Sequence, residues 1–123
     1  MEKSKLVISN VMKELGVSAS LSGYHYIRYG VELIIDDVSL IDSTMKLYDN
    51  IATKFDTTVA RAERAIRHAI TVGWSRGDVD LEKKMFGYSV DANKGKPTNS
   101  EFLATVADYI LMTQDHLNKK GGK

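Results

Sequence analysis

The chain has 123 residues, a length that fits one domain. Its 17 Lys and Arg residues nearly balance its 16 Asp and Glu residues, and this net charge of +1 excludes a protein that binds polyanions through bulk charge alone. The absence of cysteine excludes disulfides, thiolate nucleophiles and cysteine-based metal sites, and it fits a cytosolic protein.

Apolar residues recur at helical spacing in most of the chain. The spacing predicts helices over residues 5–15, 22–36, 43–55, 58–75 and 79–86, with Gly16 ending the first of them. Residues 88–97 form an expected loop. The run 98–101 (TNSE) has the spacing of a capping box and predicts a last helix that extends to about Leu117. We therefore expect an all-α domain of about six helices, without a membrane-spanning segment.

Charge is unevenly distributed along this nearly neutral chain. Residues 31–56 hold six acidic and two basic residues, whereas residues 57–96 hold eight basic and five acidic residues. The acidic pair Asp36 and Asp37 ends a helical pattern, and we interpret it as a solvated turn rather than a metal pocket. The basic block predicts one positively charged working face on the molecule.

Residues 51–66 have the pattern of a helix-turn-helix. Ala52 is a small residue where a second helix must approach the first, and Phe55 precedes the turn. Asp56 occupies the turn position, where the left-handed conformation is needed and Asp tolerates it better than most residues. Thr57 or Thr58 is placed to cap the second helix. Ala62, Ala65 and Ile66 are then expected to face inward.

The opposite side of the second helix carries Arg61, Glu63, Arg64, Arg67 and His68. Steps of three and four residues keep these side chains on one face or its shoulders. Arg bonds bidentately to guanine, and Glu accepts from the cytosine amino group, so such a helix suits the DNA major groove. The alternative from the pattern alone is an exposed amphipathic helix with Glu–Arg pairs on its surface.

Other residues have both a binding and a structural interpretation. Lys54 and Thr58 lie around the turn, where phosphate contacts are expected, although Thr58 also serves as a cap. Lys94 and Lys96 flank a glycine before the last helix, and they either contact phosphate or belong to a solvated loop. Trp74 shares the inward stripe and is expected in the core. For the tyrosines at 24, 26 and 29, the helical spacing of Tyr24, Ile27 and Val31 favours packing over base stacking.

Four sequence blocks then carry a family resemblance. They are ERAIRHAI at 63–70, WSRG at 74–77, FGY at 86–88 and KPTNSEF at 96–102. Together they closely resemble the C-terminal effector domains of stage zero sporulation protein A, the sporulation response regulator of endospore-forming bacteria, over nearly the whole chain. The resemblance implies a six-helix domain that binds double-stranded operator boxes of the TGNCGAA type, often in tandem, and that activates or represses transcription.

The resemblance also implies residue roles. Base reading falls on Arg61, Glu63 and Arg64, and neighbouring phosphates are the expected targets of Arg67 and His68. The segment after the recognition helix is expected to contact the RNA polymerase sigma subunit, with Gly77 and Phe86 as candidates. Residues 81–84 (LEKK) depart from the small, serine-rich stretch of the family, and Val59-Ala60 departs from its pattern at the start of the recognition helix.

The resemblance further concerns the domains outside this effector unit. The full regulator carries a phosphoacceptor receiver, for which residues 1–123 show no alternating βα pattern. We therefore expect one effector domain without a receiver, which binds DNA without phosphorylation. We expect no cofactor here, because a divalent metal would belong to the receiver, and no metal site. Copies are expected to associate head to tail on tandem boxes.

Two other classes of function compete with DNA recognition. The first is a protein-interaction module that docks its arginine-rich helix on an acidic partner. The second is an enzyme, but the chain lacks a nucleophile elbow, a phosphate-binding loop and clustered histidines or acids at ligand spacing. We therefore expect a protein that is not an enzyme.

Overall fold

Six α-helices and one short 3-10 helix make up the fold in the computed structural model, which describes residues 2–87 and 95–121, with side chains for 5–87 and 95–113. The α-helices are α1 (Glu2–Glu14), α2 (Ser22–Asp36), α3 (Thr44–Lys54), α4 (Val59–Trp74), α5 (Val79–Phe86) and α6 (Asn99–Gly121), and the 3-10 helix is η1 (Val38–Asp42). These residues include no strand. The predicted all-α class and the six-helix count are confirmed.

The helix boundaries follow the local sequence signals. Gly16 has a φ of +82°, the left-handed conformation that glycine adopts readily, and it follows the end of α1 as predicted. At the start of α6, the backbone N–H of Thr98 donates to Glu101 Oε1 over 2.8 Å, and the N–H of Glu101 donates to Thr98 Oγ1 over 3.1 Å. The predicted capping box is therefore present. The helix ends at Gly121, four residues beyond the predicted end.

The 3-10 helix η1 was not predicted. It follows Asp37, whose carboxylate accepts hydrogen bonds from the backbone N–H of Ser39 at 3.1 Å and from its hydroxyl at 2.6 Å. These hydrogen bonds from Ser39 lower the pKa of Asp37. The acidic pair thus lies at an exposed turn, as the sequence indicates, and Asp37 caps the short helix that leads into α3.

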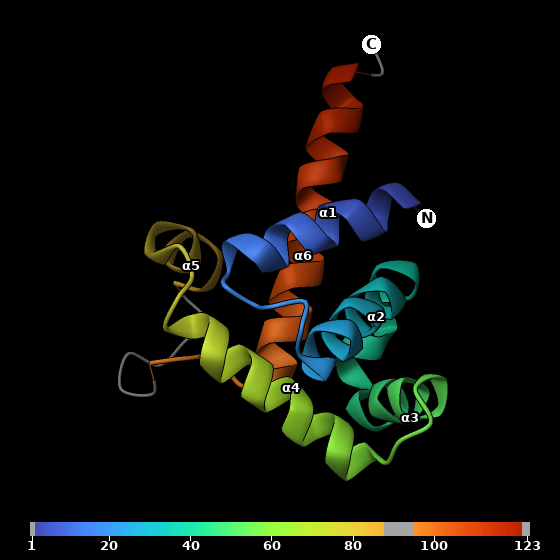
Figure 1. Ribbon diagram of the computed structural model, residues 1–123. Coiled ribbons are helices and arrows are strands. Elements are labelled where there is room, and N and C mark those ends of the chain that lie inside the picture. Colours follow the sequence, from blue (N-terminus) through green and yellow to red (C-terminus); the bar gives the residue numbers. More distant parts are fainter. Residues whose placement is uncertain (1, 88–94, 122–123) are drawn as a thin grey trace.

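Helix α6 forms the centre of the arrangement and contacts α1, α2, α4 and α5 (Figure 1). Helix α1 crosses it, and the C-terminal end of α6 projects beyond this crossing (Figure 1). Side chains from all six α-helices fill the core. The largest of the fully buried ones are Phe86, Phe102, Ile8, Met12, Leu15, Ile27, Ile34, Ile51, Ile66, Ile70, Leu103 and Ile110. Burial of this apolar surface is the main source of stability.

Two aromatic groups join the helices. Phe86 of α5 stacks on Phe102 of α6 with ring centroids 5.6 Å apart, and Trp74 of α4 meets the Phe86 ring edge-on at 5.2 Å. On the other side, Phe55 lies 4.8 Å from the Tyr26 ring and 5.8 Å from the Tyr29 ring. Trp74 and these tyrosines therefore pack against other side chains, as predicted, and the tyrosines form no open stacking platform.

Close contact between α2 and α4 fixes the orientation of α4. At Gly23 of α2, an added Cβ atom would collide with the carbonyl oxygen of Ala65 and lie 2.8 Å from the Cβ of Ala69. Only glycine allows the two backbones to approach this closely. This packing holds the buried side of α4 against the core and leaves its other side exposed.

Candidate nucleic-acid interface

Helices α3 and α4 form the predicted helix-turn-helix. Asp56 lies in the turn with a φ of +53°, the left-handed conformation expected from the sequence. The next backbone N–H, from Thr57, donates to the carbonyl of Ala52 over 2.9 Å and closes the turn. Ala52 is buried at 6% exposure and Ala62 is fully buried, so both of these small residues lie in the packed interior of the motif.

The second helix of this motif begins at a defined cap. The Thr58 hydroxyl accepts a hydrogen bond from the backbone N–H of Arg61 at 3.1 Å, while Thr58 itself keeps an extended backbone. Ala62, Ile66, Ala69 and Ile70 follow at helical spacing and are buried. The predicted inward stripe is thus confirmed at these positions, and Ala65 is half-buried beside it.

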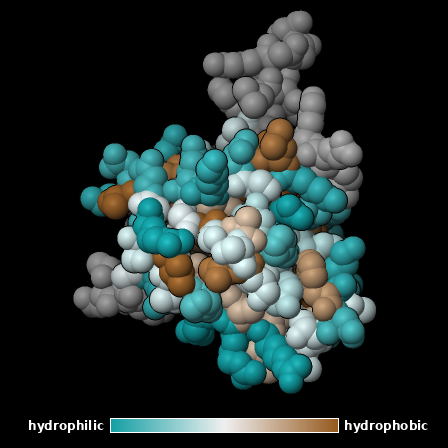
Figure 2. Space-filling view, in the orientation of Figure 1, coloured by the Kyte–Doolittle hydropathy of each residue, from teal (hydrophilic) through white to brown (hydrophobic). Residues whose placement is uncertain are grey.

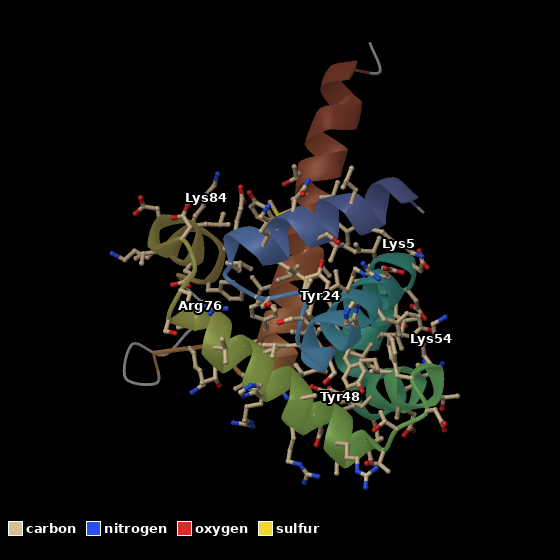
Figure 3. The ribbon with its side chains drawn as sticks, viewed as in Figure 1. Lys5, Tyr24, Tyr48, Lys54, Arg76 and Lys84 are labelled. Atoms are coloured by element: carbon tan, nitrogen blue, oxygen red, sulfur yellow. The ribbon has the colours of Figure 1, made fainter. Side chains whose placement is uncertain are left out.

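The outer face of α4 carries the residues predicted to recognise DNA. Arg61, Glu63, Arg64, Arg67 and His68 are all exposed. Figure 3 shows side chains tipped with nitrogen that project from α4 away from the other helices. Among the described side chains, Arg28 and Glu32 of α2 form an ion pair at 3.9 Å, and no ion pair joins Glu63 to an arginine. The arginines of α4 are therefore available to bind an anionic partner.

The predicted backbone-contact residues lie in different environments. Lys54, at the end of α3, is exposed, and its Nζ lies 5.6 Å from the centroid of the Tyr29 ring. Figure 3 places Lys54 near the end of α3. Lys96 is half-buried before α6. Thr58 acts as the helix cap, one of the two roles that the sequence allows. Lys94 lies outside the described residues.

A cavity of about 210 Å³ lies beside the outer face of α4. It is lined by Thr44, Tyr48, Glu63, Arg67, Thr98, Asn99 and Ser100, which come from α3, α4 and the start of α6. The Asn99 side-chain amide donates to the backbone carbonyl of Glu63 over 3.0 Å. Sequence patterns did not reveal this contact, since a capping box places Asn99 at a helix start but gives no information on its distant partner.

The hydroxyl of Tyr48 faces the same place from α3. This residue is 2% exposed. Its burial raises the pKa of the phenol, whereas the neighbouring side chains of Ser100 and Asn99 act in the opposite direction. Tyr48 thus lies at the junction of α3 and α6, a position that its spacing in the sequence, which indicates only a core residue, does not reveal.

The two candidate sigma-contact residues have structural roles. Phe86 is 1% exposed and lies in the aromatic stack with Phe102, so its side chain belongs to the core, and its sigma contact stays a prediction. Gly77 is half-buried, and an added Cβ atom there would lie 2.6 Å from the carbonyl carbon of Leu15. Close packing against the end of α1 explains this glycine without a partner. Exposed side chains of α5 include Val79, Lys83 and Lys84.

The surface around the outer face of α4 is predominantly hydrophilic. Figure 2 shows hydrophilic residues along the lower part of the molecule, which holds α3 and α4 in the orientation of Figure 1. Within the ranges that the structure describes, no helix is long and apolar enough to span a bilayer.

The second helix of the motif begins at a cap, carries arginines on its outer face and is joined to the first helix by a tight turn. These features define a helix-turn-helix DNA-binding domain. Residues 8–110 match the family described as sporulation initiation factor Spo0A C terminal, and the chain belongs to this family. The resemblance found in the sequence is thereby confirmed. The domain is a DNA-binding transcription regulator of sporulation and the effector part of a response regulator, and its family is regulatory rather than enzymatic.

Proposed function

We propose that α4 reads operator boxes of the TGNCGAA type in the major groove of double-stranded DNA. The observation that carries this proposal is the exposed row of Arg61, Glu63 and Arg64 on the first two turns of a helix whose opposite face is buried. Arginine pairs bidentately with guanine O6 and N7, and a glutamate accepts from the cytosine amino group. Since phosphates repel a carboxylate, a base contact explains Glu63 among the arginines.

Contacts to phosphates orient the helix on the duplex. We propose this role for Arg67 and His68, further along α4, for Lys54 and Thr58 beside the turn, and for Lys94 and Lys96 before α6. Arg67, Lys54 and His68 are exposed. Such contacts fix the position of a protein on DNA and carry no sequence information of their own.

Binding assays with residues 1–123 test both proposals without any phosphodonor. One duplex carries a TGNCGAA box, and the other has its central CG scrambled, each at two salt concentrations. We expect tight binding to the first duplex and weak binding to the second, with log K falling by about 0.9 per phosphate contact for each log unit of salt. Equal binding to both duplexes that vanishes at high salt would contradict base reading.

We further propose the RNA polymerase sigma subunit as a protein partner, contacted through the exposed face of α5. The support is family membership together with Val79, which is 57% exposed, and the neighbouring Lys83 and Lys84. Val79→Asp is expected to reduce activated transcription and to leave box binding intact, because Val79 lies outside α4. Unchanged transcription in this variant and in Lys84→Glu would contradict this surface.

Activation at some promoters, repression at others and head-to-tail assembly on tandem boxes complete the proposal. Met112 of α6 is 64% exposed and Leu6 of α1 is 63% exposed, so apolar surface is present on these two contacting helices. Sedimentation with duplexes that carry one box or two tests the assembly. We expect two protomers to bind two boxes more tightly than independent sites would allow.

A further inference from the structure

We propose that Asn99 is a positioning residue for base readout. Its side chain holds α4 at the position from which the side chains of α4 contact the bases. This inference rests on the proposed function of α4. The carrying observation is the 3.0 Å hydrogen bond from the Asn99 amide to the carbonyl of Glu63, across a sequence separation of 36 residues. Glu63 belongs to the base-reading set, and Arg64 follows it directly.

The backbone around Asn99 is fixed on its own helix. The reciprocal hydrogen bonds between Thr98 and Glu101 close the first turn of α6 around it. Asparagine at a helix start commonly bonds to its own backbone nearby. Here the side chain instead crosses to another helix, so a rigid helix start holds a defined point of α4.

The contact lies at a junction of three helices. Tyr48 of α3, which is 2% exposed, lies with its hydroxyl next to Asn99 and Ser100 of α6. Glu63 and Arg67 line the same cavity of about 210 Å³. The junction thus joins the first helix of the motif, its second helix and the central helix of the fold, directly beside the DNA-facing side chains.

Hydrogen bonds to bases tolerate only a small displacement of α4, so a contact that fixes the position of α4 affects base readout. An α-helix rises 1.5 Å per residue, whereas hydrogen bonds to base edges require donor–acceptor distances of about 2.7–3.2 Å. Functional groups need to be held within about 0.5 Å of their productive geometry. A shift of α4 by a third of a residue therefore weakens base contacts while leaving attraction to phosphates in place.

Three substitutions at one position separate positioning from stability. Asn99→Asp keeps the shape, removes the donor and places a carboxylate in the first turn of α6, where it stabilises the helix. Asn99→Ala removes the donor without adding charge, and Asn99→Gln retains an amide donor. Asn50→Ala removes an exposed amide from α3 and is the matched control.

The measurement is the ratio of dissociation constants for the scrambled and intact TGNCGAA duplexes, together with Tm for each variant. We expect this ratio to fall roughly three- to tenfold in Asn99→Asp and Asn99→Ala, the range set by one hydrogen bond. The ratio should fall less in Asn99→Gln than in Asn99→Ala, and the ratio of Asn50→Ala should equal that of the wild type. Because added charge acts alike on both duplexes, it cancels in the ratio.

The inference is overturned if both donor-free variants keep the wild-type ratio, or if the ratio follows Tm across the variants instead of the presence of a donor. In either case the proposed function stands, provided that the wild type discriminates the two duplexes. A wild type that binds both duplexes equally overturns the proposed function, and Asn99 then has no selectivity to set.

Discussion

The side-chain amide of Asn99 donates to the backbone carbonyl of Glu63 over 3.0 Å and thereby ties the start of α6 to the recognition helix. The central helix of the fold thus contacts α4 at one of its outward-facing residues as well as along its buried stripe. If α4 reads bases as proposed, we expect specificity to depend on how the core holds α4, in addition to the side chains that α4 presents.

Substitution of Gly23 tests the packing that orients α4. Gly23→Ala adds a Cβ atom that meets the carbonyl oxygen of Ala65, a backbone atom that cannot move aside alone. We expect a loss of at least about 2 kcal/mol in the free energy of unfolding, measured by urea denaturation. Ser22→Ala, at the neighbouring position of α2, should change it by less than about 1 kcal/mol. Equal stability of Gly23→Ala and the wild type would contradict the close approach of α2 and α4.

The turn between α3 and α4 predicts opposite effects of two substitutions at one position. Asp56 has a φ of +53°, which a β-branched residue adopts only with strain. Asp56→Val should therefore lower the free energy of unfolding by about 1–2 kcal/mol, whereas Asp56→Gly should leave it unchanged or raise it slightly. Thermal denaturation of both variants is the measurement. If valine were tolerated as well as glycine, the left-handed turn would be wrong.

Glu82 predicts a pH dependence of stability. It is 8% exposed, and within the described residues its Oε2 has no hydrogen-bond partner. Burial, and secondarily the charge of Asp78, raise the pKa of this carboxyl. Below its unfolded-state pKa the group is protonated in both states and costs nothing. Its ionisation destabilises the fold as pH rises through the raised pKa, so stability is lost toward neutral pH.

Glu82→Gln removes this ionisation and leaves the shape nearly unchanged. We expect it to raise the free energy of unfolding by roughly 1 kcal/mol at pH 7.5, with the gain disappearing near pH 4. Glu32→Gln, on α2, is a control in which the carboxylate is paired with Arg28. A gain from Glu82→Gln that is the same at both pH values would contradict the buried, unpaired carboxylate.

Phosphate contacts differ from base contacts in their response to salt. Arg67→Ala should weaken binding to box and scrambled duplexes by similar factors and reduce the slope of log K against log salt by about 1. Titrations at several salt concentrations measure both quantities. An unchanged slope accompanied by a change in sequence preference would assign Arg67 to the bases instead.

Periodic apolar residues made most of the fold predictable. The helices at 22–36 and 79–86 have the predicted bounds, because an amphipathic stripe bounded by capping or breaking residues is a local signal. The turn at Asp56 and the cap at Thr58 were also predictable, since both depend on the conformational preference of single residues. The 3-10 helix η1 was missed because five residues are too few to show a helical period.

The contacts that place the site could not be read from local patterns. The partners Asn99 and Glu63 are far apart in sequence, and no periodicity links them. Phe86 shows a different limit, because a family block identifies a residue without showing whether its side chain points to the core or to solvent. Here the Phe86 ring stacks on Phe102, whereas the exposed side chains of α5 belong to other residues of the helix.

Arg64 is the residue on which the proposed reading of individual bases by α4 is most directly measured. Binding of the wild type and of Arg64→Ala is measured against the TGNCGAA duplex and against every single-base-pair substitution in it. We expect Arg64→Ala to lose about 1–3 kcal/mol of affinity for the box and to become indifferent at one base pair while keeping its preferences elsewhere. Unchanged affinity and unchanged preference at every position would show that Arg64 does not read a base, as would a uniform loss of affinity across all duplexes.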